Sequence, residues 1–159
     1  MNFSNLSQTK FFKNERLWSF VFWFLSLIFL DQICKYLIFN FAREGVLAFL
    51  GRPFVGIILF YNQYFAFSLP FGSNLIYSIY FLVLTIIVVY LYFNFQKLSN
   101  YDYVGWLLVV AGAVSNIAER IISGRVQDFI YILSGIFNLA DFYIILGLLI
   151  LLFAKTKKL

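Results

Sequence analysis

The chain has 159 residues, of which 63% are hydrophobic and only 12% are charged, with a net charge of +5. A soluble domain has about 45–50% apolar and about 25% charged residues, so this composition predicts a membrane protein. The chain has no histidine and a single cysteine, Cys34. These absences exclude a Ser-His-Asp triad, a histidine-rich metal site and a disulfide within the chain.

Four apolar segments are long enough to cross a bilayer, which takes about 20 residues of helix. The first is longer than the apolar core of a secretory signal and lacks a small-residue cleavage site, so we expect it to be retained. The predicted spans of one polytopic domain, 1–159, are about 17–39, 75–95, 103–122 and 136–154.

The segment 40–69 is the least regular part of the chain. After a Gly-Arg-Pro break at 51–53, the run 54–61 is rich in Phe, Val and Ile, which favours a strand over a fifth helix. A re-entrant segment over 54–69 is the alternative. We predict an all-α membrane protein with four transmembrane helices and a small extracytoplasmic β-platform between the first two spans.

The basic residues favour a topology with both termini in the cytoplasm. This arrangement places seven of them inside and five outside, and two of those five, Lys35 and Arg120, lie within span ends. The basic residues occupy short connectors and form no stripe on a soluble face, so we expect no nucleic-acid partner. The seven are Lys10, Lys13, Arg16, Lys97, Lys155, Lys157 and Lys158.

Four of the seven acidic residues lie in or beside spans: Asp31, Glu119, Asp128 and Asp141. A charge at span depth costs about 2.5–3.5 kcal/mol on insertion scales, so each of these carboxylates needs a physical reason. Under the predicted topology all four lie near the outer membrane surface. We therefore expect them to converge on one polar site.

Two sets of polar residues have the spacing of neighbours on one helix face. Asp31 and Lys35 are four positions apart, and Asn116, Glu119 and Arg120 follow one another at i, i+3 and i+4. A buried ion pair that joins helices is the favoured interpretation of both sets. The alternative is that they orient a substrate or support catalytic groups.

Asp128 and Asp141 form the candidate catalytic pair. Asp128 is placed in the turn region 123–129, and Asp141 lies 13 positions later in the first turns of the fourth span, one turn after Asn138. A connector of this length lets the chain turn back and bring the carboxylates together. Two carboxylates about 3 Å apart share one proton, so one activates water and the other protonates or polarises an amide.

Other interpretations of these acids remain open on the residues alone. Asp128 would be a surface carboxylate and Asp141 a helix N-terminal one, favoured by the helix dipole. Intramembrane acids also line ion paths, although the inverted repeats common in transporters are missing. A Ser-Lys protease is disfavoured because no serine lies one helical turn from Lys35 on its face.

Taken in chain order, five polar motifs resemble those of the lipoprotein signal peptidases (signal peptidase II), and the resemblance covers most of the chain. The motifs are Asp31-x-x-x-Lys35, Asn62-x-x-x-Ala66-Phe67-Ser68, Ala111-Gly112-Ala113-x-x-Asn116-x-x-Glu119-Arg120, Gly124-Arg125-Val126-Gln127-Asp128-Phe129 and Phe137-Asn138-Leu139-Ala140-Asp141.

The resemblance implies an aspartyl endopeptidase of the bacterial cytoplasmic membrane, with Asp128 and Asp141 catalytic and the site facing the extracytoplasmic side. We expect the chain to be a monomer in contact with membrane lipid. Its implied substrate is a prolipoprotein that carries diacylglycerol on its lipobox cysteine and is cut just before that cysteine. No metal or organic cofactor is implied. The residues expected to bind substrate or support the site are Asp31, Lys35, Asn62, Asn116, Arg120, Asn138 and Ala140.

The chain departs from the family pattern in several places. Tyr64 and Phe65 replace small residues, Ser115 replaces a glycine, and Glu119 replaces an aspartate while keeping the charge. The bulk of Tyr64 is expected to reshape the platform and with it the substrate preference. The competing function is a non-enzymatic four-span transporter or membrane scaffold subunit.

Overall fold

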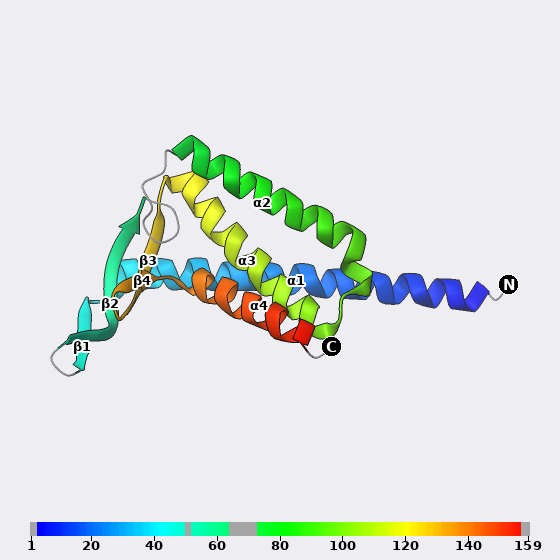
Figure 1. The fold of residues 1–159 in the computed structure, drawn as a ribbon, viewed down its shortest axis with the longest axis horizontal. Coiled ribbons are helices and arrows are strands. Elements are labelled where there is room, and N and C mark those ends of the chain that lie inside the picture. Colours follow the sequence, from blue (N-terminus) through cyan, green and yellow to red (C-terminus); the bar gives the residue numbers. More distant parts are fainter. Residues whose placement is uncertain (1–2, 50–51, 64–72, 157–159) are drawn as a thin grey trace.

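The computed structural model describes residues 3–49, 52–63 and 73–156, and side chains within 15–45, 54–63 and 78–154. Four helices run side by side, and a small sheet closes one end of them (Figure 1). The elements in chain order are α1 (Phe3–Phe41), β1 (Gly45–Phe49), β2 (Arg52–Asn62), α2 (Ser73–Asn94), the short 3-10 helix η2 (Phe95–Lys97), α3 (Asn100–Ser123), β3 (Val126–Ile132), β4 (Gly135–Phe137) and α4 (Leu139–Thr156).

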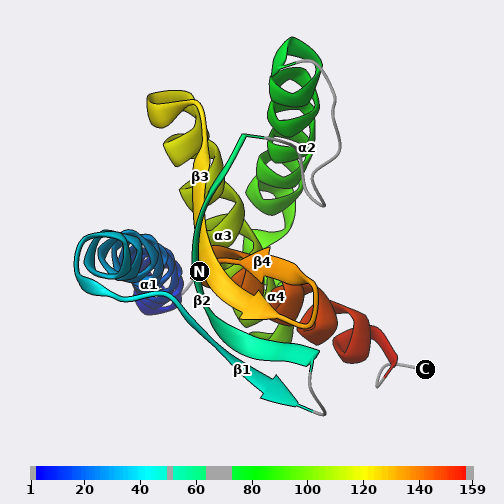
Figure 2. The same ribbon diagram turned by 90° about the vertical axis from the view of Figure 1, so that its left-hand side faces the viewer.

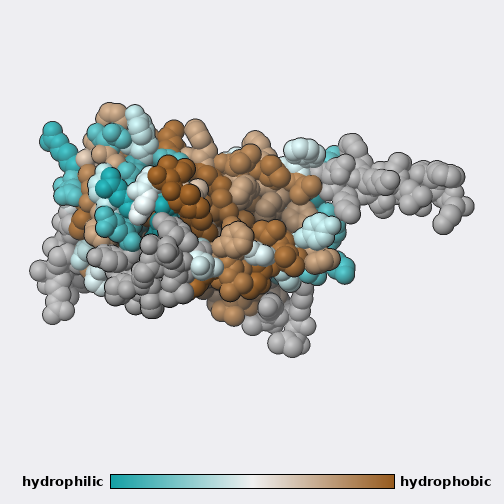
Figure 3. Space-filling view, turned by 90° about the horizontal axis from the view of Figure 1, so that it is seen from above, coloured by the Kyte–Doolittle hydropathy of each residue, from teal (hydrophilic) through white to brown (hydrophobic). Residues whose placement is uncertain are grey.

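The helices have the length and composition of membrane spans. Three segments, Glu15–Phe41 in α1, Ser78–Lys97 and Asn100–Ser123, are long and apolar enough to cross a bilayer, and Leu139–Ala154 is a shorter apolar helix. A hydrophobic band covers the middle of the molecule, with hydrophilic residues toward both ends (Figure 3). The predicted four-helix membrane fold is confirmed.

The sheet is antiparallel throughout, in the order β1-β2-β3-β4. Strands β1 and β2 lie between the first two helices, as predicted, but β3 and β4 come from the connector between α3 and α4. The platform is therefore assembled from two distant segments. The second family motif continues through Tyr64, Phe65 and 66–68, which lie outside the described residues.

Two local predictions were wrong for the same reason. Asp128 was placed in a turn, but it lies inside β3, where it is the partner of Phe60 across the ladder to β2. The fourth helix was expected to begin at about 136, but it begins at Leu139 because the residues Gly135–Phe137 pair with β3 as β4. In both cases the backbone pairs with a neighbouring strand, so Asp128 lies in a strand and α4 begins three residues later than predicted.

Glycines bring α3 and α4 into close contact. A Cβ built on Gly112 would lie 2.4 Å from the carbonyl oxygen of Ala140, and one on Gly147 would lie 2.6 Å from the carbonyl oxygen of Gly105. Small residues at such positions let helix backbones approach closely in a membrane. The contact at Gly112 sets the start of α4 against α3, where the polar residues of the site lie.

The other helices are joined to α3 in different ways. Helices α1 and α2 lie on opposite sides of α3 (Figure 2). At the end far from the sheet, the Arg16 guanidinium of α1 donates a 2.7 Å hydrogen bond to the Leu98 carbonyl and lies 5.2 Å from the Tyr103 ring centroid. This contact fixes α1 to the connector between α2 and α3.

Candidate active site

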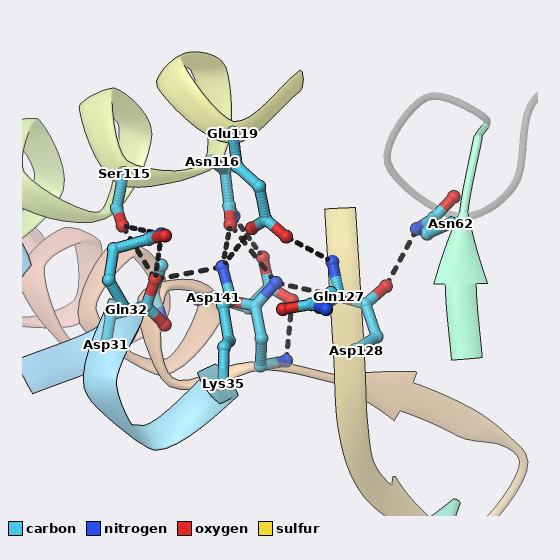
Figure 4. A network of polar contacts seen from close by, with 12 residues as sticks. Asp31, Gln32, Lys35, Asn62, Ser115, Asn116, Glu119, Gln127, Asp128 and Asp141 are labelled. Atoms are coloured by element: carbon cyan, nitrogen blue, oxygen red, sulfur yellow. Dashed lines mark hydrogen bonds and ion pairs between the residues drawn. The ribbon is translucent and has the colours of Figure 1, made fainter. Parts of the chain in front are cut away.

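The four acids predicted to converge do meet, where the C-terminal ends of α1 and α3 and the start of α4 reach the sheet (Figure 4). Asp31, Glu119 and Asp128 are buried, with exposed fractions of 0%, 8% and 2%, and Asp141 is partly exposed. Buried carboxylates need partners that replace water. The hydrogen bonds below supply those partners and fix where each carboxylate points.

Asp141 is held in a capping box at the start of α4. The Asn138 side chain accepts a 3.0 Å hydrogen bond from the Asp141 backbone N–H, and the Asn138 backbone N–H donates at 3.1 Å to Oδ2 of Asp141. The other oxygen, Oδ1, accepts a 2.8 Å hydrogen bond from the Asn116 amide. These three hydrogen bonds fix the direction in which the Asp141 carboxylate points at the start of α4.

Asp128 reaches the same point from β3. Its Oδ1 accepts a 2.6 Å hydrogen bond from the Asn138 side-chain amide, and its Oδ2 accepts a 2.9 Å hydrogen bond from the Asn62 amide at the end of β2. Burial raises the pKa of the Asp128 carboxyl to about 6; the two amide donors act in the opposite direction, and the charge of Asp141 adds to the rise.

Two asparagines connect the carboxylates. The Asn138 amide group donates to Oδ1 of Asp128 and, at 3.1 Å, to the side-chain oxygen of Asn116. The amide of Asn116 in turn donates to Asp141. Asn62, Asn116 and Asn138, predicted from the motifs, are thus brought together around the pair, and each contacts at least one of its carboxylates.

Lys35 lies at the centre of a buried ion cluster behind the pair. Its Nζ is 2.8 Å from Oδ2 of Asp31 and 2.8 Å from Oε2 of Glu119, and it donates a 3.2 Å hydrogen bond to Asn116. The sequence favours a buried ion pair that joins helices for Asp31, Lys35 and Glu119. The contacts of Lys35 have this geometry. The cluster joins α1 to α3 through a single cation.

The two carboxylates of this cluster hold the backbone next to the catalytic candidates. Oδ1 of Asp31 accepts a 3.0 Å hydrogen bond from the N–H of Ala140, the residue before Asp141. Oε1 of Glu119 accepts a 2.9 Å hydrogen bond from the N–H of Gln127, the residue before Asp128. The ion cluster therefore positions both halves of the pair, and Ala140 takes part through its backbone.

The contact between Glu119 and Gln127 was not predicted from the sequence, because a backbone N–H can be donated by almost any residue type. Ser115 was noted only as a departure from the pattern, yet its hydroxyl donates a 2.6 Å hydrogen bond to Asp31 and accepts one from Gln32. The Asn-x-x-Asp spacing of the capping box was the one readable signal, since Asn is a preferred N-cap and an acid three residues later completes the box.

Arg120 points toward α2 and not into the ion cluster. Its Nη1 donates a 2.6 Å hydrogen bond to the Tyr80 hydroxyl, and its guanidinium carbon lies 5.4 Å from the centroid of that ring. Arg120 therefore forms a polar contact between α2 and α3. Among the described residues, no three His, Cys, Asp or Glu side chains are arranged to hold a metal ion.

Comparisons with known proteins identify the family of the chain. The family described as signal peptidase (SPase) II matches residues 23–157. The lipoprotein signal peptidase of Caldicellulosiruptor bescii is 33% identical over 87% of this chain and 92% of its own length. That of Borreliella afzelii is 30% identical over 91% of this chain and 96% of its own length.

Solved structures show the same fold. A structure described as a bacterial membrane enzyme, determined by the in meso method at 2.3 Å resolution, matches with a TM-score of 0.70 and 25% identity over 87% of this chain and 88% of that one. A second, at 1.9 Å resolution, matches with a TM-score of 0.68 and 24% identity. The chain is a multi-pass membrane protein and belongs to the signal peptidase II family of aspartic-type peptidases.

Proposed function

We propose that the chain removes the signal peptide from diacylglyceryl-modified prolipoproteins, with Asp128 and Asp141 as its catalytic pair and the cut just before the lipidated cysteine. The observation that carries this proposal is the pair of carboxylates linked through Asn138 and Asn116 at the outer end of the helices. Family membership sets aside the non-enzymatic transporter or scaffold alternative.

The surroundings of the two carboxylates support different roles for them. Asp141 lies partly exposed in the first turn of α4, where a backbone N–H and the Asn116 amide orient it, so we assign it the role of general base that activates water. Asp128 is buried and its pKa is raised to about 6, so it is the carboxyl that is protonated and gives its proton to the scissile amide.

The placement of the pair supports hydrolysis at the membrane boundary. Hydrolysis needs water, which the bilayer core does not supply. Asp128 lies in β3 and Asp141 in the first turn of α4, where the helices meet the sheet (Figure 1). The N-terminus of α1 and the C-terminus of α4 lie toward the opposite end (Figure 1). With both termini cytoplasmic, the active site faces the extracytoplasmic side.

The test is a gel-shift assay with the purified full-length chain in detergent and a lipidated precursor. Asp128→Asn and Asp141→Asn should each slow conversion to the mature form by about a thousandfold, since positioned acid–base groups contribute about 10²–10⁴ in rate. Glu15→Gln is the matched control, because Glu15 is an exposed carboxylate of α1 far from the site. It should process at the rate of the unmodified chain.

The same assay separates the catalytic assignment from the substrate class. If both Asn variants process the precursor normally, the assignment of the pair is wrong. A precursor without the diacylglyceryl group should remain uncut by the active chain. If it is cut as fast as the lipidated one, the proposed requirement for a lipidated cysteine is wrong, whatever the two variants do.

A further inference from the structure

A polar cavity of about 160 Å³ lies beside the ion cluster, between the outer ends of α1 and α3 and the start of β3. Adjacent side chains of a strand point to opposite faces, so Gln127, which lines the cavity, points away from the side of β3 that carries Asp128. The cavity is thus separate from the catalytic pair. It is lined by Gln32, Tyr61, Glu119, Ser123, Arg125 and Gln127.

The walls of the cavity carry one charge of each sign. The Arg125 guanidinium lies 3.8 Å from the centroid of the Tyr61 ring, and stacking on one face leaves the N–H groups at its edge available to an oxygen ligand. Glu119 brings negative charge from α3 as part of the ion cluster, in which the two carboxylates of Asp31 and Glu119 and the single cation of Lys35 leave one net negative charge. A simple anion would be repelled by Glu119 and a simple cation by Arg125, so a zwitterion has the complementary charge pattern.

The surface beside the cavity is apolar and exposed. Phe29 and Tyr36 lie three positions before and four positions after Gln32 on the same face of α1, and they are 68% and 60% exposed. Ile122, next to Ser123 in α3, is 83% exposed. The polar cavity therefore lies directly beside an apolar surface that suits acyl chains. A boundary between polar and apolar surface is where lipid headgroups meet a membrane protein.

The size of the cavity limits what it can hold. A water molecule takes up about 30 Å³ in the liquid, so the cavity has room for about five waters, or for one small polar group such as phosphoethanolamine. A folded peptide or a sugar chain is too large to enter whole. The size of the cavity, the charges of its walls and the apolar surface beside it all fit the zwitterionic headgroup of a phospholipid.

We propose that this cavity binds the zwitterionic headgroup of a membrane phospholipid that ends in a primary ammonium, with its phosphate against Arg125 and its ammonium toward Glu119. The amides of Gln32 and Gln127 and the hydroxyls of Tyr61 and Ser123 supply the remaining hydrogen bonds. Because Glu119 also accepts from the Gln127 backbone, a bound headgroup stabilises the start of β3.

The test measures lipid retention by native mass spectrometry on the delipidated full-length chain in detergent. Phosphatidylethanolamine should be retained at one molecule per chain and about tenfold better than phosphatidylcholine, which has no ammonium N–H, or phosphatidylglycerol, which has no cation. Arg125→Gln should weaken this retention about tenfold, the scale expected when a hydrogen bond to a charged group is lost. The control, Arg43→Gln, removes an exposed arginine outside the cavity and should change nothing.

Three results would overturn the proposal. Equal retention of the three lipids, unchanged in Arg125→Gln, would mean that only annular lipid is bound. Binding of water-soluble glycerophosphoethanolamine as tightly as the lipid would show that the site takes a free headgroup. Unchanged lipid retention in Arg125→Gln with a raised KM for precursor would make the cavity a peptide subsite.

Two further measurements keep the result independent of folding and of catalysis. The lipid-free Arg125→Gln chain should unfold within a few degrees of the lipid-free unmodified chain, since Arg125 is exposed and its stacking on Tyr61 contributes little at an exposed site. Asp128→Asn should retain phosphatidylethanolamine normally even though it is expected to be inactive. Loss of lipid in that variant would contradict a cavity separate from the pair.

Discussion

The side-chain amide of Asn138 lies 2.6 Å from Oδ1 of Asp128, and the same side chain caps the helix that carries Asp141. One residue thus sets the position of both carboxylates. Its amide nitrogen orients the buried one, and its oxygen fixes the first turn of α4 beneath the other. The geometry of the proposed catalytic pair therefore depends on the same side chain that caps α4. The two roles of Asn138 can be separated by removing its amide donor while keeping an oxygen that caps the helix.

Asn138→Ser should separate these two roles. A serine hydroxyl still caps the helix, so the free energy of unfolding should change by less than about 1 kcal/mol, whereas Asn138→Ala should lose about 1 kcal/mol. Both variants lose the donor to Asp128, so kcat for precursor cleavage should fall about ten- to a hundredfold in each. Thermal unfolding and single-turnover cleavage of both variants provide the measurement. Normal cleavage by Asn138→Ser would show that the Asp128 contact is only structural.

The raised pKa of Asp128 predicts how activity depends on pH. If Asp128 is the proton donor, activity needs its protonated form, which is lost as the pH rises through the pKa of about 6. The kcat/KM for precursor should therefore fall with rising pH from about pH 6 upward. A rate that instead increases from pH 6 to 8 would assign Asp128 the role of base.

Asn138→Ser should move this pH dependence in a defined direction. The Asn138 amide stabilises the ionised form of Asp128, so its loss raises the pKa of that carboxyl further. The descending limb of the profile should shift to higher pH, although the absolute rate is lower. A shift to lower pH, or none, would contradict the proposed hydrogen bond in the active enzyme.

Removal of the central cation should destabilise the whole site. Lys35→Met leaves the Asp31 and Glu119 carboxylates buried without their shared cation, and breaking a buried ion pair costs about 3–5 kcal/mol. Adding Glu119→Gln to this variant removes one of the two stranded charges and should recover part of the loss. Unfolding in detergent measures both, with Arg43→Met as the exposed control. If Lys35→Met alone is as stable as the unmodified chain, the cluster does not stabilise the fold.

The sequence was sufficient to predict the helices and the residues that gather at the site. Apolar segments of bilayer length predicted the four helices, and the cost of placing charge in a membrane predicted that Asp31, Glu119, Asp128 and Asp141 share one location. Helix periodicity also predicted that Lys35 pairs with Asp31. These are properties of residue type and local spacing.

What the sequence could not supply are contacts that depend on distant backbone. Strand β3 pairs with β2, more than sixty residues earlier, and the residues of a strand do not say which distant strand is its partner. The bond from the Gln127 N–H to Glu119 likewise involves no particular side chain on Gln127. The sequence shows that Glu119 keeps the negative charge of the aspartate in the family pattern. It does not show that the Glu119 side chain accepts a hydrogen bond from the backbone of β3.

The close contact of α3 with α4 gives a final prediction, for Gly112. A methyl group at this position would lie 2.4 Å from the Ala140 carbonyl oxygen and 2.9 Å from the Ile144 side chain, so Gly112→Ala must push the start of α4 away from α3. Such overpacking costs about 1–3 kcal/mol in stability.

The displaced helix carries Asp141, whose carboxylate accepts from Asn116 one turn after Gly112. A shift of about 1 Å in a catalytic group costs about a hundredfold in rate, so Gly112→Ala should lose activity beyond its loss of stability. Gly45→Ala, where a Cβ meets no atom within 4 Å, is the matched control and should behave like the unmodified chain. Precursor cleavage at a temperature where both variants remain folded separates the two effects. Full activity in Gly112→Ala would mean that the pair tolerates a displaced α4, and that the glycine contact serves only helix packing.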